Sequence, residues 1–339
     1  ELAALVSGDE KKRLALSRKY KVPIAISYDD YDRLLGSGSI DAVYISLPNH
    51  LHKEYALRAA ERGIHVLSEK PMAVNSRECE AMIRAAKNCG VKLMVAYRLH
   101  FEPANLKAIE LIESGRIGEP RFFHSAFSMK VTADNIRAGE IAQGGGPLYD
   151  IGIYCINAAR YLFQAEPVEA FASSTHRGDP EVEQSREIFS ISLRFPKDRF
   201  ANFVCGYGAS DTGGYEIVGT EGSIELENAY EFIGEKSLSL KVGEKKRTIQ
   251  YAKSDQVAPE LLYFSECILS NREPEPSGME GLADIRVIEA VLKSARSGRI
   301  VPIDYAGLGT RHPSPKQRIR RPPVREPELV RAKGPSQSE

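Results

Sequence analysis

The sequence has no excess of charge of either sign and no long hydrophobic run. Lysine and arginine together number 46 among the 339 residues, and aspartate and glutamate also number 46. This balance gives no general attraction to nucleic acid or to an anionic membrane surface. No apolar run approaches the roughly 18 residues that cross a bilayer. We therefore expect a globular protein of about two domains that binds neither nucleic acid nor membrane.

Cysteines are few and widely separated. None belongs to a Cys-x-x-Cys pair, so the sequence predicts neither a disulfide framework nor a zinc site, and we expect reduced thiols in a cytoplasmic protein. His50 and His52 are the only closely spaced histidines, and at a helix start they would point in different directions, so no metal site is expected. The cysteines are Cys79, Cys89, Cys155, Cys205 and Cys267.

The N-terminus lacks both a methionine and a signal-peptide pattern. Because residue 1 is a glutamate, we expect that natural residues ahead of it have been lost. A signal peptide among such residues would export the protein to the periplasm, so that location stays open as the alternative to the cytoplasm.

A glycine-rich phosphate loop is also lacking. In a dinucleotide-binding sheet this loop joins the first strand to the first helix. Gly36-Ser37-Gly38 follows a predicted helix and precedes a strand, which is the reverse order, so we interpret it as a connector. Residues 2–6 are then predicted to be the second strand, and the first strand, its glycine turn and its helix are predicted to be missing.

Short apolar strands alternate with helices over residues 1–97. This alternation predicts βαβ units and a parallel, Rossmann-type sheet that forms a nucleotide-binding domain. Ser76 is a plausible N-cap for one of the helices. Strands are predicted at 2–6, 41–46, 64–68 and 91–96, and helices at 9–20, 50–62 and 76–88.

Residues 98–305 have a different pattern. Helices are predicted at 102–113, after Asp150, at 259–270 and at 280–297. Between residues 167 and 251, short runs rich in Val, Ile, Phe and Tyr are separated by turn residues, which predicts a large, mostly antiparallel open sheet in a substrate-binding and oligomerisation domain. Residues 306–339 are rich in proline, arginine and polar residues and are predicted to be an extended or disordered tail, or an arm lying on a neighbouring subunit.

Lys70 is the first candidate for chemistry. It follows the apolar strand that ends at Ser68, within the triplet Glu69-Lys70-Pro71. A lysine at the end of a buried strand needs a partner or a ligand, and ligands of open α/β sheets bind at these strand ends. Pro71 stiffens the following turn and is a candidate for a cis peptide bond. An ion pair with Glu69 is the competing interpretation.

Asp150 and Tyr154 form a second candidate group. Four residues apart, they share one face of a helix, and the loop Gly144 to Pro147 before them allows a backbone to approach a ligand closely. A neighbouring ammonium favours phenolate, so Lys70 beside Tyr154 would form an acid/base for a carbinol oxygen. Asp150 would orient a sugar hydroxyl. A buried tyrosine and an N-cap aspartate are the alternative reading.

Two further segments suggest a cofactor. Ser7 lies where an acidic residue normally binds the adenosine ribose, and Lys12 follows about one helical turn later. A hydroxyl and a cation suit a 2′-phosphate, which favours NADP over NAD, although a helix-capping serine and a solvated lysine explain the pattern equally well. Pro48 and Asn49 shape a strand-to-helix turn that directs amides toward the cofactor, and Asn49 is also a candidate helix cap.

Together these motifs resemble the glucose–fructose oxidoreductase/inositol dehydrogenase (Gfo/Idh/MocA) family over roughly residues 1–305. The resemblance is strongest to the glucose–fructose oxidoreductase branch, through the run from Asp150 to Asn157. The motifs are Glu69-Lys70-Pro71, Leu47-Pro48-Asn49 with His52, Tyr97-Arg98, Gly144 to Tyr154, and Ser7-Gly8 with Lys12 and Tyr28.

The resemblance implies an NADP-dependent enzyme that transfers a hydride between nicotinamide C4 and a carbon of a sugar or polyol. Lys70 would hold the substrate oxygen, Tyr154 would exchange the proton, and Asp150 and Arg98 would bind substrate. The resemblance also implies a homo-oligomer, dimer or tetramer, formed through the open sheet. The cofactor residues carried over are Ser7, Gly8, Lys12, Tyr28, Leu47, Pro48, Asn49, His52, Glu69, Lys70 and Arg98.

Two other interpretations remain. A non-catalytic dinucleotide sensor on the same fold would bind a protein partner through the open sheet. A chain without its first strand and glycine turn would hold the cofactor only weakly.

Overall fold

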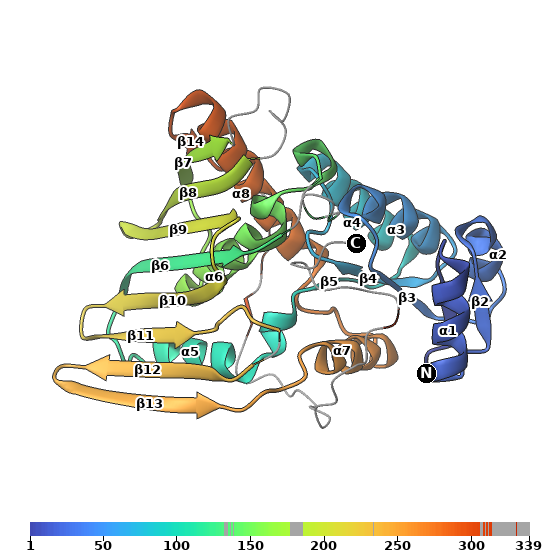
Figure 1. Ribbon diagram of the computed structural model, residues 1–339, viewed down its shortest axis with the longest axis horizontal. Helices are drawn as coiled ribbons and strands as arrows, with labels where there is room; N and C mark the ends of the chain where they lie inside the picture. Colours follow the sequence, from blue (N-terminus) through green and yellow to red (C-terminus); the bar gives the residue numbers. More distant parts are fainter. Residues whose placement is uncertain are drawn as a thin grey trace.

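A computed structural model of the chain shows two parts, and a helix near the C-terminus packs against both of them (Figure 1). It describes residues 1–131, 135, 137, 139–176, 186–232, 234–305, 308, 310, 312, 313 and 330. Most of the predicted tail, residues 306–339, therefore lies outside the described residues. Among the described residues, no helix is long and apolar enough to cross a membrane.

The first part contains the parallel strands that the sequence predicts. β3 pairs with β4 and β4 with β5, all in parallel, and β1 pairs with β2 in parallel. β2 was not predicted, because its three residues give too short an apolar run to separate from a loop. The strands are β1 (Ala4–Val6), β2 (Ile24–Ile26), β3 (Ala42–Ile45), β4 (His65–Glu69) and β5 (Leu93–Ala96).

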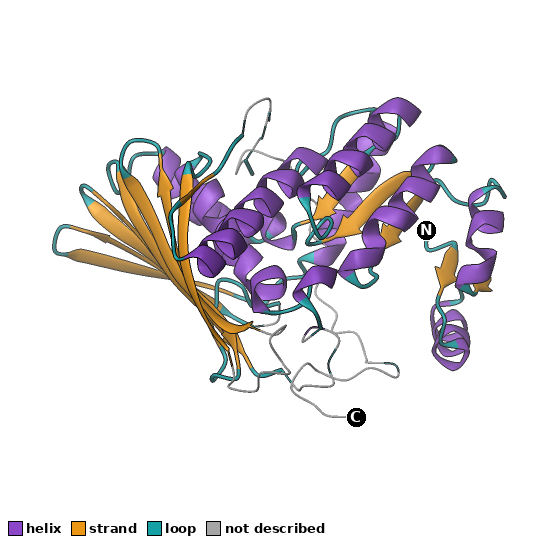
Figure 2. Cartoon of the chain, turned by 90° about the horizontal axis from the view of Figure 1, so that it is seen from above, coloured by secondary structure: helices purple, strands orange, loops and turns teal. Residues whose placement is uncertain are grey.

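The strands of the first part form two sheets. One sheet is β1-β2 and the other is β3-β4-β5, with no pairing recorded between β1 and β3 (Figure 2). In a doubly wound sheet, the first strand lies between the second and the fourth. If β1 is the second strand and β3 the fourth, the observed pairing matches that order with the first position left open. That a further strand precedes residue 1 stays a prediction.

Helix caps in this part correct two expectations. Asp9, not Ser7, caps α1, because the Asp9 carboxylate accepts a hydrogen bond from the Lys12 amide at 2.9 Å. Asn75, not Ser76, caps α4 in the same way. The helices are α1 (Glu10–Tyr20), α2 (Tyr31–Leu35), α3 (His52–Glu61) and α4 (Ser76–Cys89).

The second part is built on a nine-stranded sheet of order β13-β12-β11-β10-β6-β9-β8-β7-β14. Its pairs are antiparallel except β6 with β9, which run parallel, so the sheet is mixed but mostly antiparallel. The strands are β6 (Pro120–Met129), β7 (Glu169–His176), β8 (Arg186–Phe195), β9 (Arg199–Tyr207), β10 (Thr212–Gly219), β11 (Gly222–Glu227), β12 (Lys236–Val242), β13 (Lys245–Tyr251) and β14 (Val301–Pro302).

Helices cover one face of this sheet and leave the other open (Figure 2). The strands alternate accordingly: Phe123 and Phe203 are buried, whereas Phe122 and Phe200, which face each other in register, are exposed. The helices of the second part are α5 (Pro103–Glu113), α6 (Ile153–Phe163), α7 (Val257–Leu269) and α8 (Gly278–Ser297).

The last two helices return to the first part. α7 places Tyr263 and Phe264 in a buried cluster with Leu67 of β4 and Met94 of β5. α8 packs against α4 and β5 on one side and β7 on the other. The strand ends of β4 and β5 are therefore enclosed by residues from both parts, and this is where the candidate site lies.

Candidate active site

Lys70 lies at the carboxyl end of β4, directly before a cis peptide bond to Pro71. Its ammonium group donates to the Asp150 carbonyl oxygen at 2.6 Å and to Asp150 Oδ1 at 3.2 Å. The two side chains are only 12% and 15% exposed. Lys70 thus pairs with Asp150 from the second part, and no ion pair with its neighbour Glu69 is recorded, contrary to the alternative interpretation.

Asp150 belongs to a π-helical turn, Leu148–Gly152, that leads into α6. Such wide turns interrupt helices mainly at functional sites. Gly152 lets the turn pack against β9, because a Cβ atom there would lie 2.8 Å from Cys205 Sγ. The turn is also tied to the first part, since the Tyr149 hydroxyl donates to the Val74 carbonyl at 2.8 Å.

Two residues that the sequence did not suggest complete the surroundings of Asp150. Arg137 donates to Asp150 Oδ2 at 3.2 Å, and the Tyr207 hydroxyl donates to the same oxygen at 2.9 Å. Both are distant from any motif, and only the register of β9 and the course of the loop before Gly144 bring them here. Asp150 therefore has hydrogen-bond donors on both carboxylate oxygens.

Lys70 and Asp150 each stabilise the charged form of the other. Burial alone would raise the pKa of Asp150, but Lys70 and Arg137 hold it below its usual range. Burial would likewise lower the pKa of Lys70, but Tyr154, Asp150 and Glu69 raise it above its usual value. Both groups are therefore ionised at neutral pH, and the site holds a fixed, desolvated ion pair.

Tyr154 lies between two cations. The Lys70 ammonium is 4.8 Å from the centre of the Tyr154 ring, and the Arg98 guanidinium carbon is also 4.8 Å from it. Arg98 Nε donates to the Tyr154 hydroxyl oxygen at 3.1 Å. Lys70 thus lies beside Tyr154, as the sequence predicts, and Arg98 adds a hydrogen bond to the phenol oxygen; the acid/base role of the pair stays a prediction.

Arg98 is held in place by residues of the second part. It opens the short 3-10 helix Arg98–Phe101, directly after β5. Its guanidinium donates to the Tyr230 carbonyl at 2.6 Å and to the Gln256 side-chain oxygen. Three donors directed at three acceptors fix this side chain, and neither Tyr230 nor Gln256 was suggested by the sequence.

The predicted adenosine-binding residues lie together at the end of β1. Ser7 and Gly8 follow β1, and the Tyr28 ring is close to Gly8, 3.6 Å from the position of a Cβ atom there. Arg13, not singled out by the sequence, donates to the Ser7 carbonyl at 2.6 Å. Its Nε is buried without a partner among the described residues. The structure thus adds a second cation near Lys12.

His52 lies at the turn after β3 and contacts two backbone carbonyls. His52 is fully buried, and its ring nitrogens lie 2.9 Å from the Pro71 carbonyl and 2.8 Å from the Leu47 carbonyl. The ring joins the Leu47-Pro48 turn to the turn after Lys70. Its place in the cofactor site stays a prediction.

Asn49 also differs from one of the two expectations. It makes no helix-capping hydrogen bond, and its amide donates to the Gly144 carbonyl at 2.7 Å. Gly144 has a φ of +78°, and a Cβ atom there would lie 2.9 Å from Asn49 Cβ. The predicted close approach of the glycine loop is therefore made to the Asn49 turn.

Glu69 lies in an acidic corner of the site. Its carboxylate accepts hydrogen bonds from the Tyr44 hydroxyl and from the Lys70 amide. Glu260 of α7 is nearby, and burial together with the charge of Glu69 raises its pKa well above the usual range. Glu260 Oε2 is buried without a hydrogen-bond partner among the described residues. An unpaired buried oxygen of this kind is suited to bind a polar group of a ligand.

Two models of one family match the chain. An oxidoreductase-family NAD-binding Rossmann fold matches residues 1–97, and the C-terminal alpha/beta domain of the same family matches residues 109–303. The chain belongs to the Gfo/Idh/MocA oxidoreductase family. Its Rossmann part and its open-sheet part are the two parts described above.

Two named relatives align in sequence with 90% of the chain. The NADP(+) D-xylose 1-dehydrogenase of Haloarcula marismortui is 32% identical over 310 residues, covering 90% of this chain and 86% of the relative. D-xylose 1-dehydrogenase (NADP(+)) 2 of Haloferax volcanii is 30% identical, covering 90% and 92%. Both relatives support a place for this Gfo/Idh/MocA chain among NAD(P)-dependent oxidoreductases.

Solved structures share this fold. An aldose-aldose oxidoreductase from Caulobacter crescentus, complexed with glycerol, superposes with a TM-score of 0.84 at 37% identity, covering 89% of this chain and 92% of that one. KijD10, a 3-ketoreductase from Actinomadura kijaniata, shares the fold at 23% identity and a TM-score of 0.75. The Gfo/Idh/MocA fold is thus shared along most of the chain.

Proposed function

We propose that this chain is an NADP-dependent oxidoreductase of the glucose–fructose oxidoreductase branch that acts on C1 of an aldose. The observation that carries the proposal is one contact network that joins Lys70 to Asp150 and to the Tyr154 ring, and Arg98 to the Tyr154 hydroxyl. Names of relatives support the substrate class, since D-xylose dehydrogenases and an aldose-aldose oxidoreductase are among them.

The residues at the strand ends fit a dinucleotide. Ser7 and Gly8 with Lys12, Arg13 and Tyr28 would hold the adenosine 2′-phosphate, because two cations and a hydroxyl replace the carboxylate that favours NAD. Pro48, Asn49 and the backbone of Leu47 would line the pyrophosphate-to-nicotinamide path. Glu69, together with the unpaired oxygen of Glu260, is suited to the hydroxyls of the nicotinamide ribose. The bound cofactor would supply the hydride acceptor.

Within that site, Tyr154 is the proposed acid/base. When the aldose is oxidised, the C1–H bond breaks as a hydride leaves, and the proton of the C1 hydroxyl passes to the Tyr154 oxygen. Arg98 and Lys70 stabilise the negative charge on the phenol and the substrate oxygens. Asp150 keeps Lys70 charged and in place, and its Oδ1, which accepts one hydrogen bond from Lys70, would accept a second from a neighbouring sugar hydroxyl.

The test is an NADP+ reduction assay over a panel of aldoses and polyols that begins with D-xylose. Tyr154→Phe and Lys70→Ala should each lower kcat about 10²- to 10⁴-fold, while NADPH affinity, measured by fluorescence titration, changes little. Arg33→Ala, at a 76% exposed side chain far from the open sheet face, is the control and should keep full activity.

Unchanged turnover in both site variants would contradict the catalytic assignment. Tight NADPH binding without turnover on any substrate of the panel would contradict it too, in favour of a dinucleotide sensor.

A further inference from the structure

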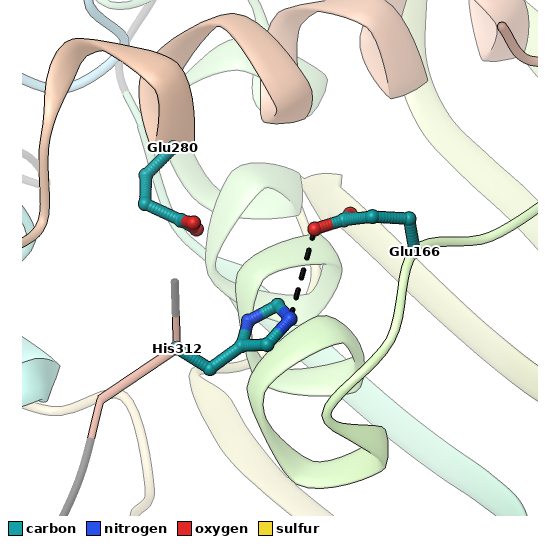
Figure 3. A group of neighbouring side chains, drawn as sticks. All are labelled: Glu166, Glu280 and His312. Carbon is teal, nitrogen blue, oxygen red and sulfur yellow. Dashed lines mark ion pairs between the residues drawn. The ribbon is translucent and has the colours of Figure 1, made fainter. Parts of the chain in front are cut away.

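A second group of polar residues lies away from the active site, where α6, α8 and the C-terminal segment meet. Glu166 follows α6, Glu280 lies in the first turn of α8, and His312 belongs to the C-terminal segment (Figure 3). One ligand atom from each of the three lies within 4.8 Å of the other two. His312 Nε2 is 3.7 Å from Glu166 Oε1. Three elements distant in sequence thus direct nitrogen and oxygen atoms at one point.

Arg160 neutralises only part of the negative charge around this point. Its buried guanidinium pairs with Glu166 at 2.5 Å and with Glu280 at 3.0 Å. A third carboxylate, Asp284, is 2.6 Å from the same guanidinium. Among the described residues, three buried or half-buried carboxylates thus share one arginine. Uncompensated charge in such surroundings is costly unless a proton or a further cation neutralises it.

Arg160 donates to both Glu166 oxygens, at 2.5 Å and 2.8 Å, and to Glu280 Oε2, which leaves Glu280 Oε1. Glu280 is 1% exposed, and its Oε1 atom is buried with no hydrogen-bond partner among the described residues. In Figure 3 this carboxylate points toward Glu166 and His312. A buried carboxylate oxygen without a donor is uncommon in native proteins and calls for a bound group.

His312 is suited to be a ligand. Its side chain is 11% exposed, and burial together with the charge of Arg160 lowers its pKa to about 4. The imidazole is therefore neutral at pH 7, which is the form that binds metal ions.

We propose that Glu166, Glu280 and His312 bind one divalent metal ion of the zinc or manganese type. One imidazole and two carboxylates are a donor set that these ions accept, and the ion would compensate the charge that Arg160 leaves. The bound ion ties the C-terminal segment at residue 312 to the first turn of α8 and to the turn after α6. Its role is structural, because the Lys70 site is built from other residues.

The experiment uses the untagged full chain, freed of metal with a chelator and titrated with ZnCl2 in a calorimeter, with MnCl2 as a second probe. We expect one ion per chain in the wild type. His312→Ala and Glu280→Gln should weaken binding at least about tenfold, as loss of a metal-supporting group typically does. X-ray absorption of the zinc-loaded protein should show one imidazole in the coordination shell.

His124→Ala is the matched control. His124 forms an exposed pair with Glu216 at 3.3 Å on the open sheet face, so its loss should leave the affinity unchanged. His312→Ala leaves every pair of Arg160 intact, so it should fold even if the α8 variant does not. No stoichiometric ion in the wild type would overturn the proposal, as would equal affinity of the wild type and His312→Ala.

Discussion

Arg98 is the residue in hydrogen-bond contact with the phenol oxygen of Tyr154. Lys70 was the residue that the sequence made prominent, but its ammonium lies against the Tyr154 ring and is paired with Asp150. Arg98 donates directly to the phenol oxygen while two other acceptors fix its guanidinium. We infer that the two cations have different roles: Lys70 binds the substrate oxygen, and Arg98 binds the phenol oxygen.

The substitution Arg98→Lys tests the role of Arg98 at the phenol oxygen. A lysine keeps the charge but cannot direct three donors at Tyr154, Tyr230 and Gln256 together. We expect kcat to fall about 10²-fold, as when one donor to a reacting oxygen is removed, with a smaller change in KM for NADP+. Steady-state kinetics in both substrates measures this. Arg33→Lys, at a 76% exposed side chain, is the control, and an unaltered kcat in Arg98→Lys would refute the role of Arg98.

At the scale of the elements, the sequence predicts the parallel strands and the strand-end position of Lys70. It also predicts that Asp150 and Tyr154 lie together, because a helical spacing of four is a local property. It does not predict the contact of Arg98 with Tyr154, since the two residues are 56 positions apart on elements joined only by packing. Arg137 and Tyr207 escape prediction for the same reason, because no local pattern marks them.

The Asn49 turn and the Gly144 loop meet in a contact that a single methyl group would disturb. Gly144→Ala places a Cβ atom 2.9 Å from Asn49 Cβ in a left-handed conformation. We expect the free energy of unfolding to fall by more than about 1 kcal/mol and the affinity for NADPH to fall as well. Urea denaturation and NADPH titration measure the two effects.

Gly208→Ala separates strain from contact. Gly208 has a φ of +84° but no neighbour near its missing Cβ, so its substitution should lower stability without changing NADPH affinity. Equal NADPH affinity of the Gly144 variant and the wild type would contradict the proposed place of this loop beside the cofactor.

A buried histidine between the active site and the Arg160 group makes stability depend on pH. His100 follows Arg98 in the same 3-10 helix, and burial lowers its pKa to about 3, with His312 and Arg160 adding to the effect. Its folded pKa is below the unfolded value of about 6.5, so the unfolded chain binds the extra proton as the pH falls. The contribution of His100 to stability is therefore complete above pH 6.5 and is lost progressively below it.

Denaturant unfolding at pH 7, 6 and 5 tests this dependence. Below pH 6.5, His100 should remove about 1.4 kcal/mol of unfolding free energy per pH unit. His100→Gln should flatten the slope by that amount, and His50→Gln, at an exposed position, should not. Glu280 contributes to the pH dependence with the opposite sign, but it does so equally in all three proteins and cancels when their slopes are compared. Identical slopes in the wild type, His100→Gln and His50→Gln would contradict this description of His100.

At the scale of the whole molecule, the open sheet face is the surface that helices leave uncovered. Phe122 and Phe200 face each other across β6 and β9 and are 44% and 42% exposed. Exposed aromatic residues grouped on one face mark an interaction site. We expect a homo-oligomer that buries this face, a dimer or a tetramer.

Phe200→Asp should break such an oligomer. A charge at the centre of the face makes its burial unfavourable, so analytical ultracentrifugation should show monomers in place of the wild-type assembly. Leu269→Asp, at an 87% exposed position on α7, is the control and should assemble like the wild type. A monomeric wild type would refute the expected oligomer.

In the proposed reaction, the site around Tyr154 transfers a hydride from C1 of an aldose to NADP+. The most direct measurement follows the label from an aldose deuterated at C1, D-xylose first, into the cofactor by mass spectrometry. The predicted result is one deuterium in each NADPH that the wild type forms, with almost no labelled NADPH from Tyr154→Phe. NADPH without deuterium, or equal labelling by wild type and Tyr154→Phe, would contradict the claim.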